Sequence, residues 1–154
     1  MAADMLHFTF LDTDHVIEAR AGKAVSDIFA QEGEPAFRQW ERRIVEELTR
    51  RAKTVIATGG GLPADAANLA SLKMHALVIC LWASPETIWE RVREHDHRPL
   101  LNEPDPLGRI RELLAEREPF YRQADVLVNS GMRSVREVAQ HVVHQFHMAR
   151  SVPR

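Results

Sequence analysis

The alternation of apolar and polar stretches predicts strands and helices that follow each other in turn. Short apolar or β-branched runs predict strands at residues 6–11, 54–58, 77–81 and 125–129. Helices are predicted at residues 15–21, 24–31, 64–72, 107–116 and 134–148, with two more starting at residues 34 and 85. The run at 77–81 is the most apolar, which is typical of a buried parallel strand. Strands alternating with helices predict an α/β fold built on a parallel sheet.

The helix that starts at residue 34 has the clearest pattern. Its apolar residues recur at spacings of three and four and predict one buried stripe, formed by Phe37, Trp40, Ile44, Val45 and Leu48. Arg38 and Glu41 lie three positions apart on the adjoining face. They form either an exposed ion pair, worth a few tenths of a kcal/mol, or part of a site.

Three consecutive glycines, Gly59, Gly60 and Gly61, follow the predicted strand at 54–58. Glycines permit positive φ angles and leave backbone N–H groups unshielded, so that the main chain approaches a ligand closely. Ligands bind at the carboxyl ends of strands in open α/β sheets. A tight strand-to-helix turn without a ligand would use the same residues, so the glycines alone are a weak signal.

Two carboxylates, Asp12 and Asp14, come where the first predicted strand ends. Residues two apart on a strand point to the same side. Solvated acids of a turn are one interpretation. The other is a pair that holds the water ligands of Mg²⁺ and a substrate hydroxyl.

Composition limits the classes of function. The 154 residues predict one domain, and a net charge of -2 gives no electrostatic basis for binding nucleic acid or an anionic membrane. A single cysteine, Cys80, lies in an apolar run, which predicts a core residue and a cytoplasmic protein. The charged, proline-rich stretch at about residues 94–107 has no periodicity and predicts a mobile lid.

Several motifs, taken together, resemble the shikimate kinase family of the P-loop kinase superfamily. They are FLDTDHVIE at 10–18, GEPAFRQWE at 33–41, TGGG at 58–61, RPLL at 98–101, and REPFY at 117–121 followed by AD at 124–125. The resemblance covers residues 6–143. It implies a single three-layer α/β/α domain with a parallel sheet over residues 1–154. It also implies ATP-dependent phosphorylation of the shikimate 3-hydroxyl, a step of chorismate and aromatic amino-acid biosynthesis.

The resemblance also implies roles for residues that would bind shikimate. Asp14 would accept hydrogen bonds from the ring hydroxyls, including the attacking one, and orient it or take its proton. Arg38 and Arg117 would bind the shikimate carboxylate, for which a planar guanidinium is suited. Glu41 would hold Arg38 in place, and Gly59, Gly60 and Gly61 would let the main chain close against the ring.

Other residues would contact the nucleotide and its metal. Asp12 would lie beside Mg²⁺, through water. Arg98 would reach the γ-phosphate and offset transition-state charge. Arg91 would stack on adenine, with the loop at residues 129–134 on the other face of the base.

The chain departs from this family at one motif. No GxxxxGK[ST] occurs in the 154 residues, and none of Lys23, Lys53 and Lys73 follows a glycine-rich turn. The residues before Leu11 match only the tail of the helix after that loop and the second strand of the family. We therefore expect a sheet without its first, central strand. The loss forfeits burial of order 10 kcal/mol, comparable with the stability of a whole domain.

Three interpretations follow. We favour a start assigned too far downstream, or a fragment, of an active kinase; this chain alone would then be a very poor kinase, and the protein would be a monomer when the missing segment is present. A non-catalytic module that binds shikimate or another protein is the second. The third is a related kinase with another small substrate, against which Asp14, Arg38 and Arg117 argue.

Overall fold

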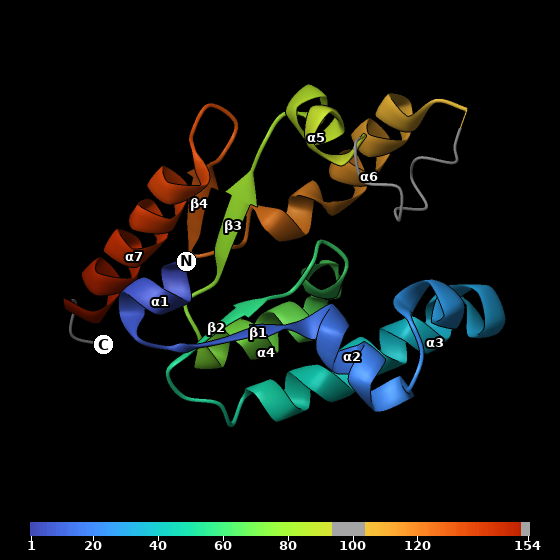
Figure 1. The fold of residues 1–154 in the computed structure, drawn as a ribbon, viewed down its shortest axis with the longest axis horizontal. Helices are drawn as coiled ribbons and strands as arrows, with labels where there is room; N and C mark the ends of the chain where they lie inside the picture. Colours follow the sequence, from blue (N-terminus) through green and yellow to red (C-terminus); the bar gives the residue numbers. More distant parts are fainter. Residues whose placement is uncertain (94–103, 152–154) are drawn as a thin grey trace.

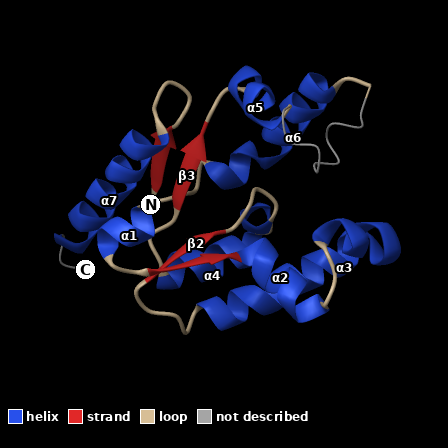
Figure 2. Cartoon of the chain, viewed as in Figure 1, coloured by secondary structure: helices blue, strands red, loops and turns tan. Residues whose placement is uncertain are grey.

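The computed structural model describes residues 1–93 and 104–151. Figure 1 shows the order of its elements, and Figure 2 shows how strands and helices are distributed. The elements are α1 (Ala2–Leu6), β1 (Thr9–Asp12), α2 (Thr13–Ala21), α3 (Val25–Leu48), β2 (Thr54–Ala57), the 3-10 helix η1 (Leu62–Ala64), α4 (Ala66–His75), β3 (Ile79–Trp82), α5 (Pro85–Val92), α6 (Pro106–Tyr121), β4 (Val126–Asn129) and α7 (Val135–Ser151).

The strands form two separate parallel pairs. β1 pairs with β2, with Thr9 opposite Thr54, and β3 pairs with β4, with Ile79 opposite Val126. The predicted α/β class and parallel pairing are therefore confirmed. In the described part of the chain, β2 and β3 each have a strand neighbour on one side only. This arrangement agrees with a parallel sheet that lacks its central strand.

The first strand starts later than predicted. Leu6 is the last residue of α1, and β1 begins at Thr9. Between them His7 adopts a left-handed conformation with φ 54°, and its N–H caps the helix at the Asp4 carbonyl. The apolar run at 6–11 thus spans a helix end and a strand, which its hydrophobicity alone did not separate.

The long helix α3 consists of two helices joined at a kink. Gly33 interrupts it with φ 81° and ψ 170°, and Pro35 lies in the first turn of the second part. A helix start at residues 34–35 was predicted and is confirmed. The predicted stripe is confirmed: Phe37, Ile44, Val45 and Leu48 are buried, and Trp40 is partly buried against them. The adjoining face carries Arg38 and Glu41.

Two apolar clusters hold the half of the molecule around β1 and β2 together. The larger joins α2 to both parts of α3 and contains Ile17, Ile28, Phe37, Ile44 and Leu48. The smaller links α3 to η1 and α4 through Val45, Leu62 and Leu72. These clusters fix α2, α3 and η1 relative to one another at the carboxyl ends of β1 and β2.

The burial predicted for β3 is wrong at its carboxyl end. Leu81 is 55% exposed and Trp82 is 46% exposed, and Cys80 is half-buried rather than a core residue. Among the described residues only β4 pairs with β3, so one edge of this apolar strand stays accessible. Burial raises the pKa of the Cys80 thiol.

Helix α6 connects the two halves. It packs on α5 and also on η1, which belongs to the half around β1 and β2. It continues to Tyr121, five residues beyond the predicted end, with Pro119 inside its last turn and the Arg122 N–H bonded to the Glu118 carbonyl at 2.9 Å. No helix in residues 1–93 or 104–151 is long and apolar enough to cross a membrane.

Candidate functional site

The glycine turn (residues 59–61) follows β2 and uses its glycines in two ways. Gly59 has φ 60°, a left-handed conformation that glycine adopts without strain. Gly60 and Gly61 have ordinary φ values, but side chains lie where their Cβ atoms would be. A methyl group on Gly60 would lie 2.8 Å from the Tyr121 hydroxyl, and one on Gly61 would meet the Arg38 guanidinium. The close approach of Tyr121 and Arg38 to this stretch of main chain therefore requires glycine at both positions.

The segment after the glycine turn is held by hydrogen bonds. Asp65 caps α4 by accepting from the N–H groups of Ala67 (2.9 Å) and Asn68 (3.1 Å). The buried Asn68 side chain donates to the Leu62 carbonyl at 3.2 Å. Arg42 of α3 bonds the same Asp65 carboxylate at 2.8 and 3.1 Å. These bonds fix the glycine turn against the second part of α3.

Asp12 and Asp14 have different positions. Asp12 is the N-cap of α2, and its Oδ1 accepts from the Asp14 N–H at 2.9 Å. The Asp14 carboxylate lies over the glycine turn, with its oxygens 3.8 and 3.9 Å from the position of a Cβ on Gly59. Of the two acids, Asp14 faces the turn.

Arg38 forms ion pairs with two carboxylates of its own helix. Its Nη1 donates to Glu41 at 2.6 Å, and Nη2 and Nε donate to Glu34 at 2.7 and 3.1 Å. A guanidinium has five N–H donors, so two remain beyond these three bonds within the described residues. Desolvation opposes the charge of Arg38, but its bonds to Glu41 and Glu34 outweigh that effect and raise its pKa.

Glu41 is buried, with its side chain 3% exposed. Burial raises the pKa of this carboxyl above its ordinary value, the charge of Asp14 adds to the rise, and Arg38 and Arg117 act against it. Arg38 and Glu41 therefore do form an ion pair, but it is not the exposed pair that the sequence allowed, because Glu41 is buried. The carboxylate instead lies inside a cluster of charges contributed by α2, α3 and α6.

Helix α6 contributes Arg117 and Tyr121 from its last turns. Arg117 Nη1 would lie 3.1 Å from a Cβ on Gly60, and the Tyr121 hydroxyl donates to the Gly60 carbonyl at 2.8 Å. Arg117 forms no ion pair with a carboxylate in the described part of the chain. A half-buried cation beside exposed glycine backbone favours an anionic ligand.

The structure thus brings together most of the side chains predicted to bind a substrate. Asp14, Arg38 and Arg117 approach the glycine turn from α2, α3 and α6 respectively. Two guanidinium groups suit one carboxylate, and a carboxylate such as Asp14 accepts hydrogen bonds from hydroxyl groups. The arrangement suits a small molecule that carries a carboxylate and hydroxyls.

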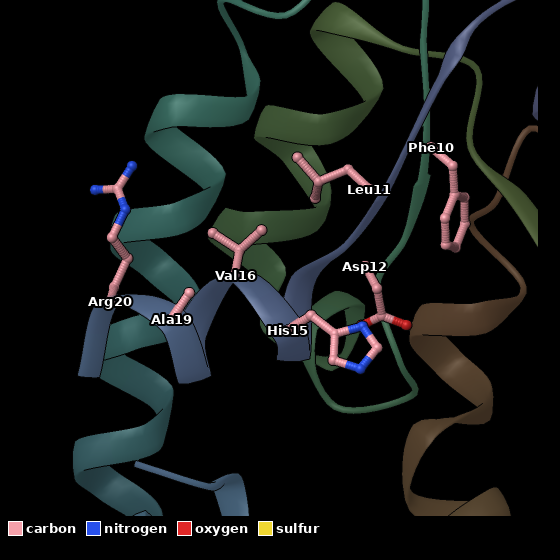
Figure 3. A pocket seen from close by; sticks show the side chains of 7 residues that line it. All are labelled: Phe10, Leu11, Asp12, His15, Val16, Ala19 and Arg20. Carbon is pink, nitrogen blue, oxygen red and sulfur yellow. The ribbon is translucent and has the colours of Figure 1, made fainter. Parts of the chain in front are cut away.

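A shallow recess of about 360 Å³ lies beside β1 and α2. Figure 3 shows the Asp12 carboxylate and the His15 ring next to each other at one end of the recess and Arg20 at the other. One Asp12 oxygen is occupied by the Asp14 N–H. No group of three His, Cys, Asp or Glu side chains in the described residues could hold a metal. A Mg²⁺ ion at Asp12 would therefore keep a shell of water, as this ion commonly does.

Arg91, which was predicted to contact a nucleotide, lies on another element. Arg91, on α5, donates to the Ser130 hydroxyl at 3.1 Å and to its carbonyl at 2.5 Å. The structure therefore places Arg91 against the loop at 129–134 with which it was predicted to form an adenine site. Arg98 and most of the predicted lid at 94–107 lie outside the described residues.

Sequence reasoning missed three partners of these residues. Glu34 lies four positions before Arg38, and Tyr121 lies four positions after Arg117, so helical spacing places each pair on one face. Asp65 precedes a predicted helix and is a favoured capping residue. All three signals were present, and the motifs around Glu34 and Tyr121 were noted, but these contacts were not predicted.

Comparison with protein families gives a match over most of the chain. The family model described as shikimate kinase matches residues 1–147. Shikimate kinase from Caldanaerobacter subterraneus subsp. tengcongensis is 42% identical over 144 residues, which cover 94% of this chain and 84% of the relative. Shikimate kinase from Cupriavidus pinatubonensis is 41% identical over 148 residues, covering 96% and 77%.

Solved structures agree with the sequence relatives. Shikimate kinase from Acinetobacter baumannii in complex with shikimate matches with a TM-score of 0.90 and 35% identity, covering 99% of this chain and 85% of that one. Shikimate kinase from Aquifex aeolicus matches with a TM-score of 0.81 and 30% identity, covering 95% and 85%. The two strand pairs are therefore arranged as in a P-loop kinase-like fold.

Proposed function

The chain belongs to the shikimate kinase family, whose members are phosphotransferases, and on that premise we propose that it serves the phosphorylation of the shikimate 3-hydroxyl by ATP. The observation that carries the proposal is the convergence of Asp14, Arg38 and Arg117 on the glycine turn. The reaction belongs to chorismate and aromatic amino-acid synthesis. The free thiol of Cys80 suits a reducing cytoplasm, where we place the protein.

Arg38 and Arg117 bind the shikimate carboxylate. Within the described residues Arg38 has two N–H donors left after Glu34 and Glu41 have fixed its guanidinium, and Arg117 lies beside Gly60, the neighbour of the Gly61 that Arg38 approaches. Charge-assisted hydrogen bonds from two planar groups fix both the position and the orientation of a carboxylate. Gly59, Gly60 and Gly61 let the ring approach the main chain.

Asp14 accepts hydrogen bonds from the ring hydroxyls and orients the one that attacks. In the reaction this hydroxyl oxygen forms a bond to the γ-phosphorus of ATP, and the bond from that phosphorus to the β–γ bridging oxygen breaks. The hydroxyl proton passes to Asp14 or to water, and ADP leaves with the bridging oxygen. Phosphoryl transfer has a loose transition state, so orientation is the larger part of what Asp14 supplies.

The nucleotide side of the site is less complete in this chain. Asp12 would hold Mg²⁺ through water, and this ion neutralises phosphate charge when bound. Arg91 would stack on adenine, and Arg98 would offset charge at the γ-phosphate. The sequence contains no GxxxxGK[ST] loop to cradle the phosphates. We therefore propose that the 154 residues by themselves are a very poor kinase.

ATP turnover by the purified chain, with and without shikimate and Mg²⁺, tests this proposal. We expect background turnover from the chain and shikimate-dependent turnover, raised more than about a thousandfold, when a strand and a GxxxxGK[ST] loop are added at its N-terminus. Shikimate-dependent turnover by the unextended chain would show that other residues cradle the phosphates.

A non-catalytic module that binds shikimate is the second candidate function. The single-sided pairing of β2 and β3 favours it, because a partner's strand could occupy the open edges. The extended chain separates the candidates: it would bind shikimate but stay inactive if the module had lost its chemistry.

A further inference from the structure

The last turns of α6 present two side chains to a single glycine. Arg117 and Tyr121 are four positions apart, so they lie on the same face of the helix. Both reach Gly60: a Cβ there would be 2.8 Å from the Tyr121 hydroxyl and 3.1 Å from Arg117 Nη1. The phenol hydroxyl donates to the Gly60 carbonyl at 2.8 Å, across 61 positions of sequence.

This hydrogen bond sets the orientation of a whole peptide group. A trans peptide is planar, so the Gly60 carbonyl and the Gly61 N–H point in opposite directions. With the carbonyl held by Tyr121, the Gly61 N–H is directed away from that side chain. Within the described residues this N–H has no acceptor. A peptide between two glycines rotates easily, so its orientation needs an external contact.

We propose that Tyr121 is a positioning residue for substrate binding. Its hydroxyl fixes the peptide between Gly60 and Gly61 so that the Gly61 N–H donates a hydrogen bond to the substrate held by Arg38 and Arg117. The inference rests on the proposed function, because it needs shikimate in front of the glycine turn. The alternative is that the bond only anchors the end of α6.

Calorimetric titration of shikimate into wild type and Tyr121→Phe tests the inference. The substitution keeps the ring and removes only the hydroxyl. We expect the dissociation constant to rise about 3- to 10-fold, the factor that corresponds to one hydrogen bond. The melting temperature should stay unchanged. In a ¹⁵N spectrum the Gly61 amide resonance should shift, because its peptide is no longer held in one orientation.

Gln123→Met is the matched control. It removes the bond from Gln123 Nε2 to the Pro119 carbonyl (2.9 Å) at the same helix end without touching the glycine turn. We expect it to leave the affinity for shikimate unchanged. An equal loss of affinity in the control and in Tyr121→Phe would show that the bond only anchors the helix.

The outcomes also separate this inference from the proposed function. Equal affinity of wild type and Tyr121→Phe overturns the inference alone. A folded wild-type chain that does not bind shikimate overturns the proposed function, and the inference with it. A weaker Tyr121→Phe with an unchanged melting temperature and a shifted Gly61 resonance supports both.

Discussion

Arg38 Nη1 lies 2.6 Å from Oε2 of Glu41, whose side chain is 3% exposed. The partner of this arginine is thus a buried carboxylate on its own helix, three positions away. Glu34 holds the same guanidinium from the solvent side, with its own side chain 62% exposed. A buried charge is tolerated when it is paired and hydrogen-bonded, so Arg38 and Glu41 depend on each other.

Glu41→Gln should weaken shikimate binding about tenfold. The amide keeps the size of the side chain but loses the charge that orients the Arg38 guanidinium, and charge-assisted bonds are the stronger ones. Glu34→Gln is the control, and we expect less than a threefold effect because exposed ion pairs contribute little. Calorimetric titration measures both. Equal effects of the two substitutions would contradict a special role for the buried carboxylate.

The buried carboxyl of Glu41 also predicts how stability varies with pH. Burial raises its pKa above the ordinary 4.5, against the opposing charges of Arg38 and Arg117. Its contribution to the free energy of unfolding is therefore complete below about pH 4.5 and is lost as pH rises through the raised pKa. The stability of wild type relative to Glu41→Gln should therefore fall as the pH rises above about 4.5.

Urea unfolding of the two proteins at several pH values measures this difference. Groups common to both proteins cancel, which leaves the titration of Glu41 and its coupling to Asp14, Arg38 and Arg117. A relative stability that rises with pH would mean that ion pairing has lowered the pKa of Glu41.

Gly61→Ala should impair shikimate binding, and it should also lower stability because the displaced Arg38 leaves the buried Glu41 carboxyl without its partner. The new methyl group would occupy the place of the Arg38 guanidinium, a flexible end that moves aside. We expect shikimate affinity to fall at least about tenfold, since Arg38 is displaced from the carboxylate. Gly22→Ala is the converse control. Its φ of 69° strains an alanine by about 1 kcal/mol, but no other atom lies within 4 Å of the added carbon.

Affinity and melting temperature together decide this prediction. The account requires different profiles: a lower melting temperature in both variants, weak shikimate binding in Gly61→Ala, and normal shikimate binding in Gly22→Ala. Normal shikimate affinity in Gly61→Ala would show that Arg38 is not needed where the structure places it.

The exposed end of β3 predicts self-association of the 154-residue chain. Leu81 is 55% exposed beside a strand edge that no described strand covers, and exposed apolar edges favour intermolecular pairing. Leu81→Lys should reduce association at micromolar concentration, as measured by sedimentation velocity. Met74→Lys, on α4 and 69% exposed, is the control and should leave association unchanged. Equal effects would indicate a general effect of added charge.

Sequence periodicity predicted the elements whose environment is local. The second part of α3 was found because its apolar stripe and Glu34-Pro35 start are properties of one helix. The burial of β3 was mispredicted because it depends on what lies beside the strand, which periodicity does not report. The charges around Glu41 likewise depend on Asp14 of α2 and Arg117 of α6, which are distant in sequence.

Residue type and spacing predicted some residues of the candidate site but not the contacts between them. Arg38, Arg117 and Asp14 were named from motifs, and the structure brings all three to the glycine turn. The reason for Gly60 and Gly61 was only partly anticipated, since neither uses a positive φ. Contacts across the fold, such as Tyr121 with Gly60, decide which glycines must lack a side chain.

Titration of shikimate into the 154-residue chain in the absence of nucleotide tests the central claim most directly. We expect saturable binding that Arg117→Ala weakens at least about tenfold. Arg122→Ala, which removes an exposed arginine paired with Glu118 on the same helix, should bind like wild type. A folded wild-type chain without affinity for shikimate, or an Arg117→Ala variant that binds as tightly as wild type, would contradict the account.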